Sequence, residues 1–355
     1  MKKLLYFSIS ILIVTGLLGF FSWKMIASQG VQTSENTLTI FNWGEYIDPA
    51  LITKFEKETG YKVNYSTFDS NEAMYAKVKQ GGTAYDIVVP SEYMVQKMAS
   101  EHLLIKLDHT QIKGLNDDNA KLLNNSFDPN NNYSLPYFWG TFGIVYNDQM
   151  IKNPPKNWSD LWSSQYKNSI LLTDSSRDVM GMGLITTGSS VNSTNETQVT
   201  QAYQKLLQLT PNVKAVLGDE IMNYMINNET PLAAVYSGQA SEMTAQNSHL
   251  HYIVPERTNI WYDNIVIPKT AKNLKAAYAF INFMQEPENA AQNAEYVGYS
   301  TPNDKAKALL PADVREDTQY YPTLSQIKDD EAYTNLNAYW TERYNDLYLQ
   351  FKMNK

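Results

Sequence analysis

Residues 37–90 read TLTIFNWGEYIDPALITKFEKETGYKVNYSTFDSNEAMYAKVKQGGTAYDIVVP. Three short runs within this stretch are apolar, or alternate between apolar and polar residues, as β-strands do: 38–43, 62–68 and 85–89. Between the first two runs, Asp48 and Pro49 predict the start of a helix and Gly60 predicts its end. Strands that alternate with helices indicate parallel βαβ units, so the sequence predicts an α/β fold with helices on both faces of the sheet.

Aromatic, acidic and hydroxyl side chains gather where the first and third of these strands end. Trp43, Glu45 and Tyr46 follow the first strand, and Ser91 and Tyr93 follow the third. In open α/β sheets, ligands bind beyond the carboxyl ends of the strands. We therefore predict that both groups belong to a binding site.

Trp261 and Asp263 repeat the combination of an aromatic ring and a carboxylate further along the chain. An aromatic face stabilises a cation by roughly 0.5 to 2 kcal/mol, and a carboxylate adds a charge-assisted hydrogen bond to an ammonium group. Together they suit an alkyl ammonium ligand. The alternative is that these aromatic residues belong to the core or to an interface, with the acids as nearby helix caps.

The remainder of the chain indicates a second structural unit. A polar, turn-rich stretch at 128–132 precedes an apolar and aromatic segment at 133–146, which is suited to crossing between two domains. Further strands and helices are predicted after it, at 158–162, 169–173, 197–209, 232–236, 252–254, 261–268 and 274–284. A length of 355 residues also favours two domains over one.

The N-terminus carries a candidate membrane segment. Residues 4–23 are uncharged and mostly apolar, with Lys2 and Lys3 before them and Lys24 after them. Twenty helical residues span about 30 Å, the thickness of a bilayer core. We predict that residues 1–27 are a membrane anchor, with a cleaved signal peptide as the alternative, and that 28–36 form a linker. The basic start then stays in the cytoplasm and the rest of the chain lies outside.

Composition and missing motifs exclude several classes of function. The net charge of −8 argues against a nucleic-acid partner, and the absence of cysteine excludes thiol catalysis, disulfides and thiolate metal sites. No phosphate loop or nucleophile elbow occurs, and Gly181 and Gly183 lack the third glycine of a dinucleotide turn. His249 and His251 would share one face of a strand, but no third ligand is indicated. We therefore expect no metal, no cofactor and no catalytic residues.

Several motifs together resemble the spermidine/putrescine-binding proteins of bacterial polyamine ABC transporters. They lie at 41–48, 85–93, 137–140, 171–179, 261–264 and 298–303, and the resemblance extends from about 37 to 322. It implies the two-lobed, type II periplasmic-binding-protein fold, in which crossing strands join two α/β lobes around a ligand cleft. The implied lobes are 36–140 with 262–307, and 141–261 with 308–355.

The resemblance also implies ligand contacts. They are Trp43, Glu45, Tyr46, Ser91 and Tyr93 in the first lobe, Asp178 in the second, Trp261 and Asp263 near the hinge, and Tyr299. Two further positions depart from the family pattern: Ser175 stands where members often have Asp, and Tyr236 replaces a Trp. The loss of one acid leaves open how many amines are recognised. A family glutamine contact aligns with Tyr333, and this role is not transferred.

A protein of this family captures putrescine or spermidine and delivers it to a membrane permease, which works with a separate ATPase. The resemblance therefore implies a non-enzymatic receptor outside the cytoplasm, tethered to the membrane or secreted. A monomer is the default expectation, because a receptor must release its cargo. Two alternatives remain open. The same fold could bind a sugar or, with Arg177, an amino acid. Asp263 and a second carboxylate could also be the acid and base of an anchored glycosidase.

Overall fold

The computed structural model describes residues 36–323 and 326–355, and it shows an α/β protein built on nine strands. The strands are β1 (Thr37–Trp43), β2 (Lys62–Phe68), β3 (Ile87–Val88), β4 (Ser134–Asn147), β5 (Ile170–Thr173), β6 (Val213–Leu217), β7 (Leu232–Tyr236), β8 (Leu250–Ile253) and β9 (Ile260–Val266). They follow the order β2-β1-β3-β9-β4-β7-β5-β6, and β8 pairs with β4.

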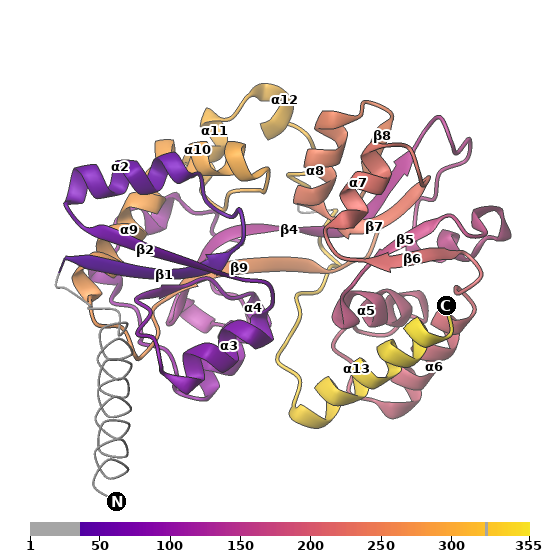
Figure 1. Cartoon of the computed structure of the whole chain (residues 1–355), viewed down its shortest axis with the longest axis horizontal. Coiled ribbons are helices and arrows are strands. Elements are labelled where there is room, and N and C mark those ends of the chain that lie inside the picture. Colours follow the sequence, from indigo (N-terminus) through magenta and orange to yellow (C-terminus); the bar gives the residue numbers. More distant parts are fainter. Residues whose placement is uncertain (1–35, 324–325) are drawn as a thin grey trace, which may run out of the picture.

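The described α-helices surround these strands on both sides (Figure 1). They are α2 (Pro49–Thr59), α3 (Asn71–Gln80), α4 (Glu92–Ser100), α5 (Ser176–Thr186), α6 (Glu196–Leu207), α7 (Glu220–Ile226), α8 (Ser237–Gln246), α9 (Leu274–Gln285), α10 (Pro287–Val297), α11 (Asp304–Leu309), α12 (Ala312–Arg315) and α13 (Ala338–Met353).

The first βαβ units form as the sequence predicts. Strand β1 pairs in parallel with both β2 and β3. The Asp48 side chain caps α2 by accepting the backbone N–H of Ala50 at 2.8 Å, and Gly60 ends this helix with a φ of 78°. This left-handed conformation is one that glycine adopts without steric cost. The carboxyl ends of β1 and β3 therefore lie side by side, which places their following residues near each other.

Strands β4 and β9 connect the two halves of the molecule (Figure 1). The first part of β4, from Ser134 to Thr141, pairs antiparallel with β9. Its second part, from Phe142 to Tyr146, pairs antiparallel with β7. One long strand thus belongs to the sheets of both halves. Most of the apolar segment predicted at 133–146 forms this strand.

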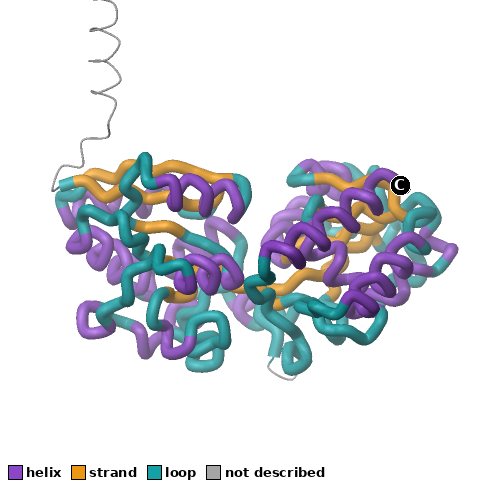
Figure 2. Tube along the Cα trace, turned by 90° about the horizontal axis from the view of Figure 1, so that it is seen from below, coloured by secondary structure: helices purple, strands orange, loops and turns teal. Residues whose placement is uncertain are grey.

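The buried apolar side chains form three clusters. Core 1 takes its residues from 38–139 and 260–321, while core 2 and core 3 take theirs from 142–351. Neighbouring residues such as Leu171 and Leu172 fall into different clusters, so cores 2 and 3 cover opposite faces of the same strands. Viewed from below, the two halves appear as separate bodies with a narrow connection (Figure 2).

The chain between 308 and 322 packs on core 1, through Leu310 and Tyr321. It then returns to the other half, where α13 packs against α5 and α6. Within the part of the chain that the structure describes, no helix is long and apolar enough to cross a membrane. The predicted segment 1–27 and almost all of the predicted linker 28–36 lie outside that part.

Candidate functional site

Asp263 is a buried acid in β9, at the connection between the two halves. Its side chain is 7% exposed. One carboxylate oxygen accepts the Tyr46 hydroxyl at 2.6 Å, and the other accepts the Ser91 hydroxyl at 2.6 Å. Burial raises the pKa of Asp263 to about 6, although these two hydrogen bonds act in the opposite direction. The carboxylate thus has hydroxyl donors but lies where its charge is poorly solvated.

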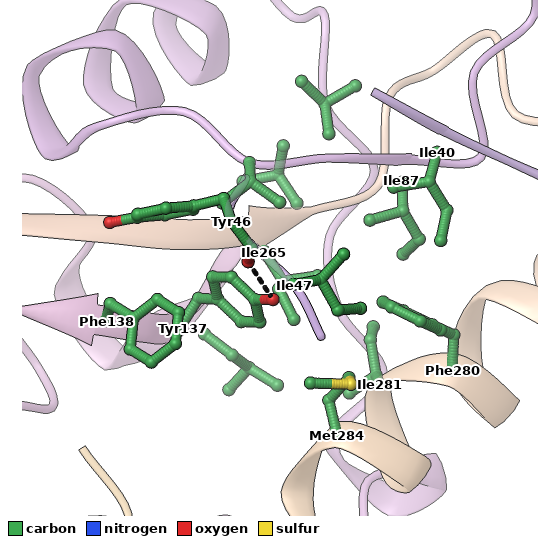
Figure 3. Packing of buried hydrophobic residues seen from close by; sticks show 14 of the residues in the cluster. Ile40, Tyr46, Ile47, Ile87, Tyr137, Phe138, Ile265, Phe280, Ile281 and Met284 are labelled. Carbon is green, nitrogen blue, oxygen red and sulfur yellow. Dashed lines mark hydrogen bonds between the residues drawn. The ribbon is translucent and has the colours of Figure 1, made fainter. Parts of the chain in front are cut away.

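Both donors are held in place by their own neighbours. The hydroxyl of Tyr137 donates to the backbone carbonyl of Tyr46 at 2.8 Å, while Ile47 points into the aliphatic core and the Tyr46 hydroxyl points away from it (Figure 3). Ser91 precedes α4, and the Asn71 amide bonds both its backbone N–H and its hydroxyl, at 3.1 and 3.0 Å. The βαβ arrangement therefore aims two fixed hydroxyl groups at Asp263.

Asp178 is a second buried acid, in the first turn of α5 on the other side of the connection. It is 2% exposed, and its oxygens accept the hydroxyls of Tyr236 at 2.5 Å and Tyr333 at 2.8 Å. Burial raises the pKa of Asp178, while its hydrogen bonds and the nearby Arg177 lower it. Ser175 caps α5 by accepting the Asp178 backbone N–H at 3.3 Å.

A chain of aromatic rings links the two acids. The ring centres of Tyr46 and Tyr299 lie 5.4 Å apart, those of Tyr299 and Trp261 lie 5.1 Å apart, and those of Trp261 and Tyr236 lie 6.3 Å apart. Each pair meets edge to face, at angles of 67°, 87° and 84°. Because Tyr46 bonds Asp263 and Tyr236 bonds Asp178, the path from one acid to the other is continuous.

Glycine is required where this cluster approaches the backbone. A Cβ atom at Gly140 would lie 2.6 Å from the Trp261 ring, and one at Gly238 would overlap the ring of Tyr299. Both glycines therefore let the rings pack directly on the chain. Neither position was predicted as part of the site, because a glycine in a strand or a helix indicates close packing without naming its partner.

The structure does not join Trp43, Glu45 or Tyr93 directly to either acid. Trp43 lies beside Phe68, with ring centres 4.5 Å apart, and its buried indole N–H lacks a hydrogen-bond partner in the described chain. Glu45 is exposed, with a φ of 51°. The hydroxyl of Tyr93 donates to Glu72 at 3.1 Å. These three ligand contacts therefore stay predictions.

Sequence reasoning missed one buried acid at this site. Glu92 is 1% exposed and accepts the backbone N–H groups of Tyr262 at 3.0 Å and Tyr333 at 3.2 Å. Burial raises its pKa to about 8. Glu92 stands between two predicted residues, Ser91 and Tyr93, but an acid in the first turn of a helix is ordinary, so the pattern did not distinguish it.

Two other features lie away from this cluster. A cavity of about 640 Å³ borders Ile185 and Thr186 at the far end of α5, roughly 11 Å along the helix from Asp178, and its Arg257 and Glu331 pair with each other. The exposed His249 and His251 bond the two oxygens of Asp148 at 3.0 Å each. Among the described residues, no group of His, Asp and Glu has an arrangement that could hold a metal ion.

Comparison with known proteins gives consistent matches. The family model described as bacterial extracellular solute-binding protein matches residues 50–323. The spermidine/putrescine-binding periplasmic protein of Escherichia coli is 40% identical over 306 residues, which cover 85% of this chain and 88% of that protein. The putrescine-binding periplasmic protein PotF of the same organism is 32% identical, over 84% of this chain and 86% of that protein.

Two solved structures show the same fold. The spermidine/putrescine ABC transporter substrate-binding protein PotD of Streptococcus pneumoniae has a TM-score of 0.84 and 54% identity, covering 90% of this chain and 99% of that one. A putative spermidine/putrescine ABC transporter of Listeria monocytogenes has a TM-score of 0.85 and 52% identity, covering 90% and 100%. They confirm the predicted two-lobed α/β fold of periplasmic binding proteins. With its family match, its fold and its aromatic and acidic cluster, the chain belongs to the bacterial extracellular solute-binding proteins.

Proposed function

We propose that this chain is a receptor that captures a polyamine, putrescine or spermidine, between Asp263 and Asp178. The observation that carries the proposal is the pair of buried carboxylates joined by a continuous chain of aromatic rings. Within the described residues, neither acid forms an ion pair with a Lys, Arg or His side chain. A buried carboxylate without a cation is costly, so an ammonium group at each end of a ligand would stabilise both.

The rings suit the apolar part of such a ligand. Methylene groups would lie against Trp261, Tyr236 and Tyr299, with one ammonium at Asp263 and the other at Asp178. The relatives named for spermidine and putrescine support this choice of ligand. The full set of proposed ligand-binding residues is Trp43, Glu45, Tyr46, Ser91, Tyr93, Ser175, Asp178, Tyr236, Trp261, Asp263 and Tyr299.

The cleft lies between two lobes in this proposal. One lobe is built on core 1 and the other on cores 2 and 3, with β4 and β9 as the hinge strands. The sequence places the final boundary at 308. The packing of Leu310 and Tyr321 on core 1 supports assigning residues up to about 321 to the first lobe.

The remaining assignments follow from the family. The loaded receptor would deliver its ligand to a membrane permease that works with a separate ATPase, and it would act as a monomer that leaves its ligand chemically unchanged.

An N-terminal anchor would hold the receptor beside the permease and raise the effective concentration of the receptor there. Fractionation of cells that express the full chain tests the anchor: protein recovered in the membrane fraction supports it, and protein free in the medium supports cleavage.

Calorimetric titration of the full chain, purified in detergent, tests the ligand. Putrescine and spermidine are titrated separately, with maltose and arginine as controls for the sugar and amino-acid alternatives. Saturable binding of a polyamine alone supports the proposal, and chromatography of the ligand after overnight incubation should recover it intact. Binding of maltose or arginine without polyamine binding would contradict it.

A further inference from the structure

A short segment near the C-terminus, residues 331–335, runs between the two halves ahead of α13 (Figure 1). Two of its backbone N–H groups bond side chains of α4. The N–H of Tyr333 donates to Glu92 at 3.2 Å, and the N–H of Asn335 donates to Gln96 at 2.8 Å. Glu92 and Gln96 are four residues apart, and therefore lie on one face of α4. Helix α4 thus holds one edge of the segment by two successive bonds.

The opposite edge of the segment is bonded to the other half. The N–H of Thr334 donates to the Asn192 side chain at 2.8 Å, and the Asn192 amide donates to the carbonyl of Ala332 at 2.8 Å. Arg177 donates to the carbonyl of Thr334 at 3.2 Å. The segment is therefore fixed along both edges, by α4 on one side and by the region around α5 on the other.

Glu92 also reaches the site through its second oxygen. That oxygen accepts the N–H of Tyr262 at 3.0 Å, and Tyr262 directly precedes Asp263. The residue bonded to its first oxygen, Tyr333, donates its hydroxyl to Asp178 at 2.8 Å. One buried carboxylate therefore holds the two chain segments that position the two acids of the cleft.

We propose that Glu92 is a positioning residue that fixes the spacing between Asp263 and Asp178 and thereby selects the length of the diamine that fits. The proposal rests on the function proposed above. A ligand with a charge at each end needs both carboxylates at matching distances. Moving the Tyr333 segment relative to β9 changes that distance without removing either carboxylate.

A carboxylate is suited to this position because both of its oxygens accept hydrogen bonds. A glutamine would turn its amide N–H₂ towards one of the two backbone N–H groups and leave that donor unpaired. The groups that face Glu92 are Tyr262 and Asp263 on β9 and Tyr333 on the segment, with Arg177 over the ring of Tyr333 at 4.4 Å. Burial and the charge of Asp263 raise the pKa of Glu92, while the two N–H groups favour its ionised form.

The test is calorimetry of the full-length Glu92→Gln variant with α,ω-diamines that carry three, four, five or six methylene groups. We expect the best ligand of the parent to bind roughly tenfold more weakly, because the Tyr333 segment is no longer held where its hydroxyl places Asp178 at the matching distance. We also expect the parent's preference between neighbouring chain lengths to flatten or to move by one methylene. A role in stability alone would lower the unfolding temperature and leave these ratios unchanged.

Two further variants complete the design. Glu101→Gln changes an exposed acid at the other end of α4 and should keep the affinities and ratios of the parent. Gln96→Leu removes the second bond of α4 to the segment, and it replaces Glu92→Gln if that variant fails to fold. The inference is overturned if Glu92→Gln keeps the parent's affinity ratios between diamines of neighbouring length. If only Gln96→Leu folds, unchanged ratios in that variant overturn it. A parent chain that binds no diamine overturns the proposed function itself, and this inference with it.

Discussion

Burial of Asp263 favours the neutral, protonated form of its carboxyl group over the charged form. Its pKa of about 6 lies above the value of 3.8 for an exposed Asp. Because the pKa is raised in the folded protein, the stabilisation that Asp263 gives the fold is fully present below about pH 4. It is lost as the pH rises past 6. At neutral pH the ionised carboxyl therefore costs the ligand-free protein about 3 kcal/mol. Binding of an ammonium group would recover part of this free energy.

The Asp263→Asn variant tests this cost. We expect its free energy of unfolding, relative to the parent, to rise by about 2.4 kcal/mol between pH 4 and pH 7.5, because the amide does not ionise. Urea denaturation of both ligand-free proteins at the two pH values measures the difference. The exposed Asp313→Asn should change by less than about 0.5 kcal/mol. A pH-independent difference for Asp263→Asn would show that burial does not raise its pKa.

The residues of the site were predictable where their chemistry was unusual for their position. An aromatic ring next to an acid at a strand end, as at Trp261 and Asp263, is such a case, and the structure buries both. Glu92 was not predictable, because its role depends on Tyr333, which lies more than two hundred residues away. A local sequence pattern does not indicate a contact between residues that lie so far apart in the chain.

At the scale of single elements, the start of α5 decides where Asp178 lies. Ser175 directly precedes this helix, and its hydroxyl accepts the backbone N–H of Asp178. We expect Ser175→Ala to lower the free energy of unfolding by about 1 kcal/mol through loss of the cap. Chemical denaturation measures this, with the exposed Ser164→Ala as the control. Equal stability of the two variants would contradict the capping role.

The first turn of α8 approaches the aromatic cluster through Gly238. A methyl group there would overlap the ring of Tyr299, which must then move away from Trp261. We expect Gly238→Ala to weaken putrescine binding by at least about tenfold, because the ligand's methylene groups lose their packing contact with the Tyr299 ring. Calorimetry measures the affinity. Gly82→Ala, where the added methyl meets no neighbour within 4 Å, should bind as the parent does, and parental affinity in Gly238→Ala would remove Tyr299 from the site.

The sequence predicted the helices and strands whose apolar residues recur at regular spacing or form a long run. Strands β1 and β2 largely alternate between apolar and polar residues, and β4 is a long, mostly apolar run, so all three were located. Helix α13 was not predicted, although its buried residues Tyr344, Leu347, Tyr348 and Phe351 follow helical spacing. Three of those four are aromatic, and polar residues surround them, so the helix has a weak apolar face that tertiary packing completes.

At the scale of the whole molecule, the proposed function depends on movement of the two halves about β4 and β9. Asp263 and Tyr46 are fixed to core 1, whereas Asp178 and Tyr236 are fixed to the second half. A ligand that bonds acids from both halves binds the closed arrangement better than an open one. It can therefore shift the population towards closure only by using both contacts together.

Small-angle scattering of the full chain in detergent, with the micelle matched out by neutron contrast, measures this closure. Saturating putrescine should reduce the radius of gyration of the parent, because the open members of the ensemble are depleted. Asp178→Asn keeps Asp263 and its hydroxyl donors but loses the charge on the second half, so putrescine should leave its radius unchanged at concentrations that saturate the parent. A parent radius that stays the same when calorimetry shows full occupancy would mean that both acids already lie at their binding distance. The hinge would then have no part in capture, and the buried network around Asp263 and Asp178 would act as a rigid, preformed site.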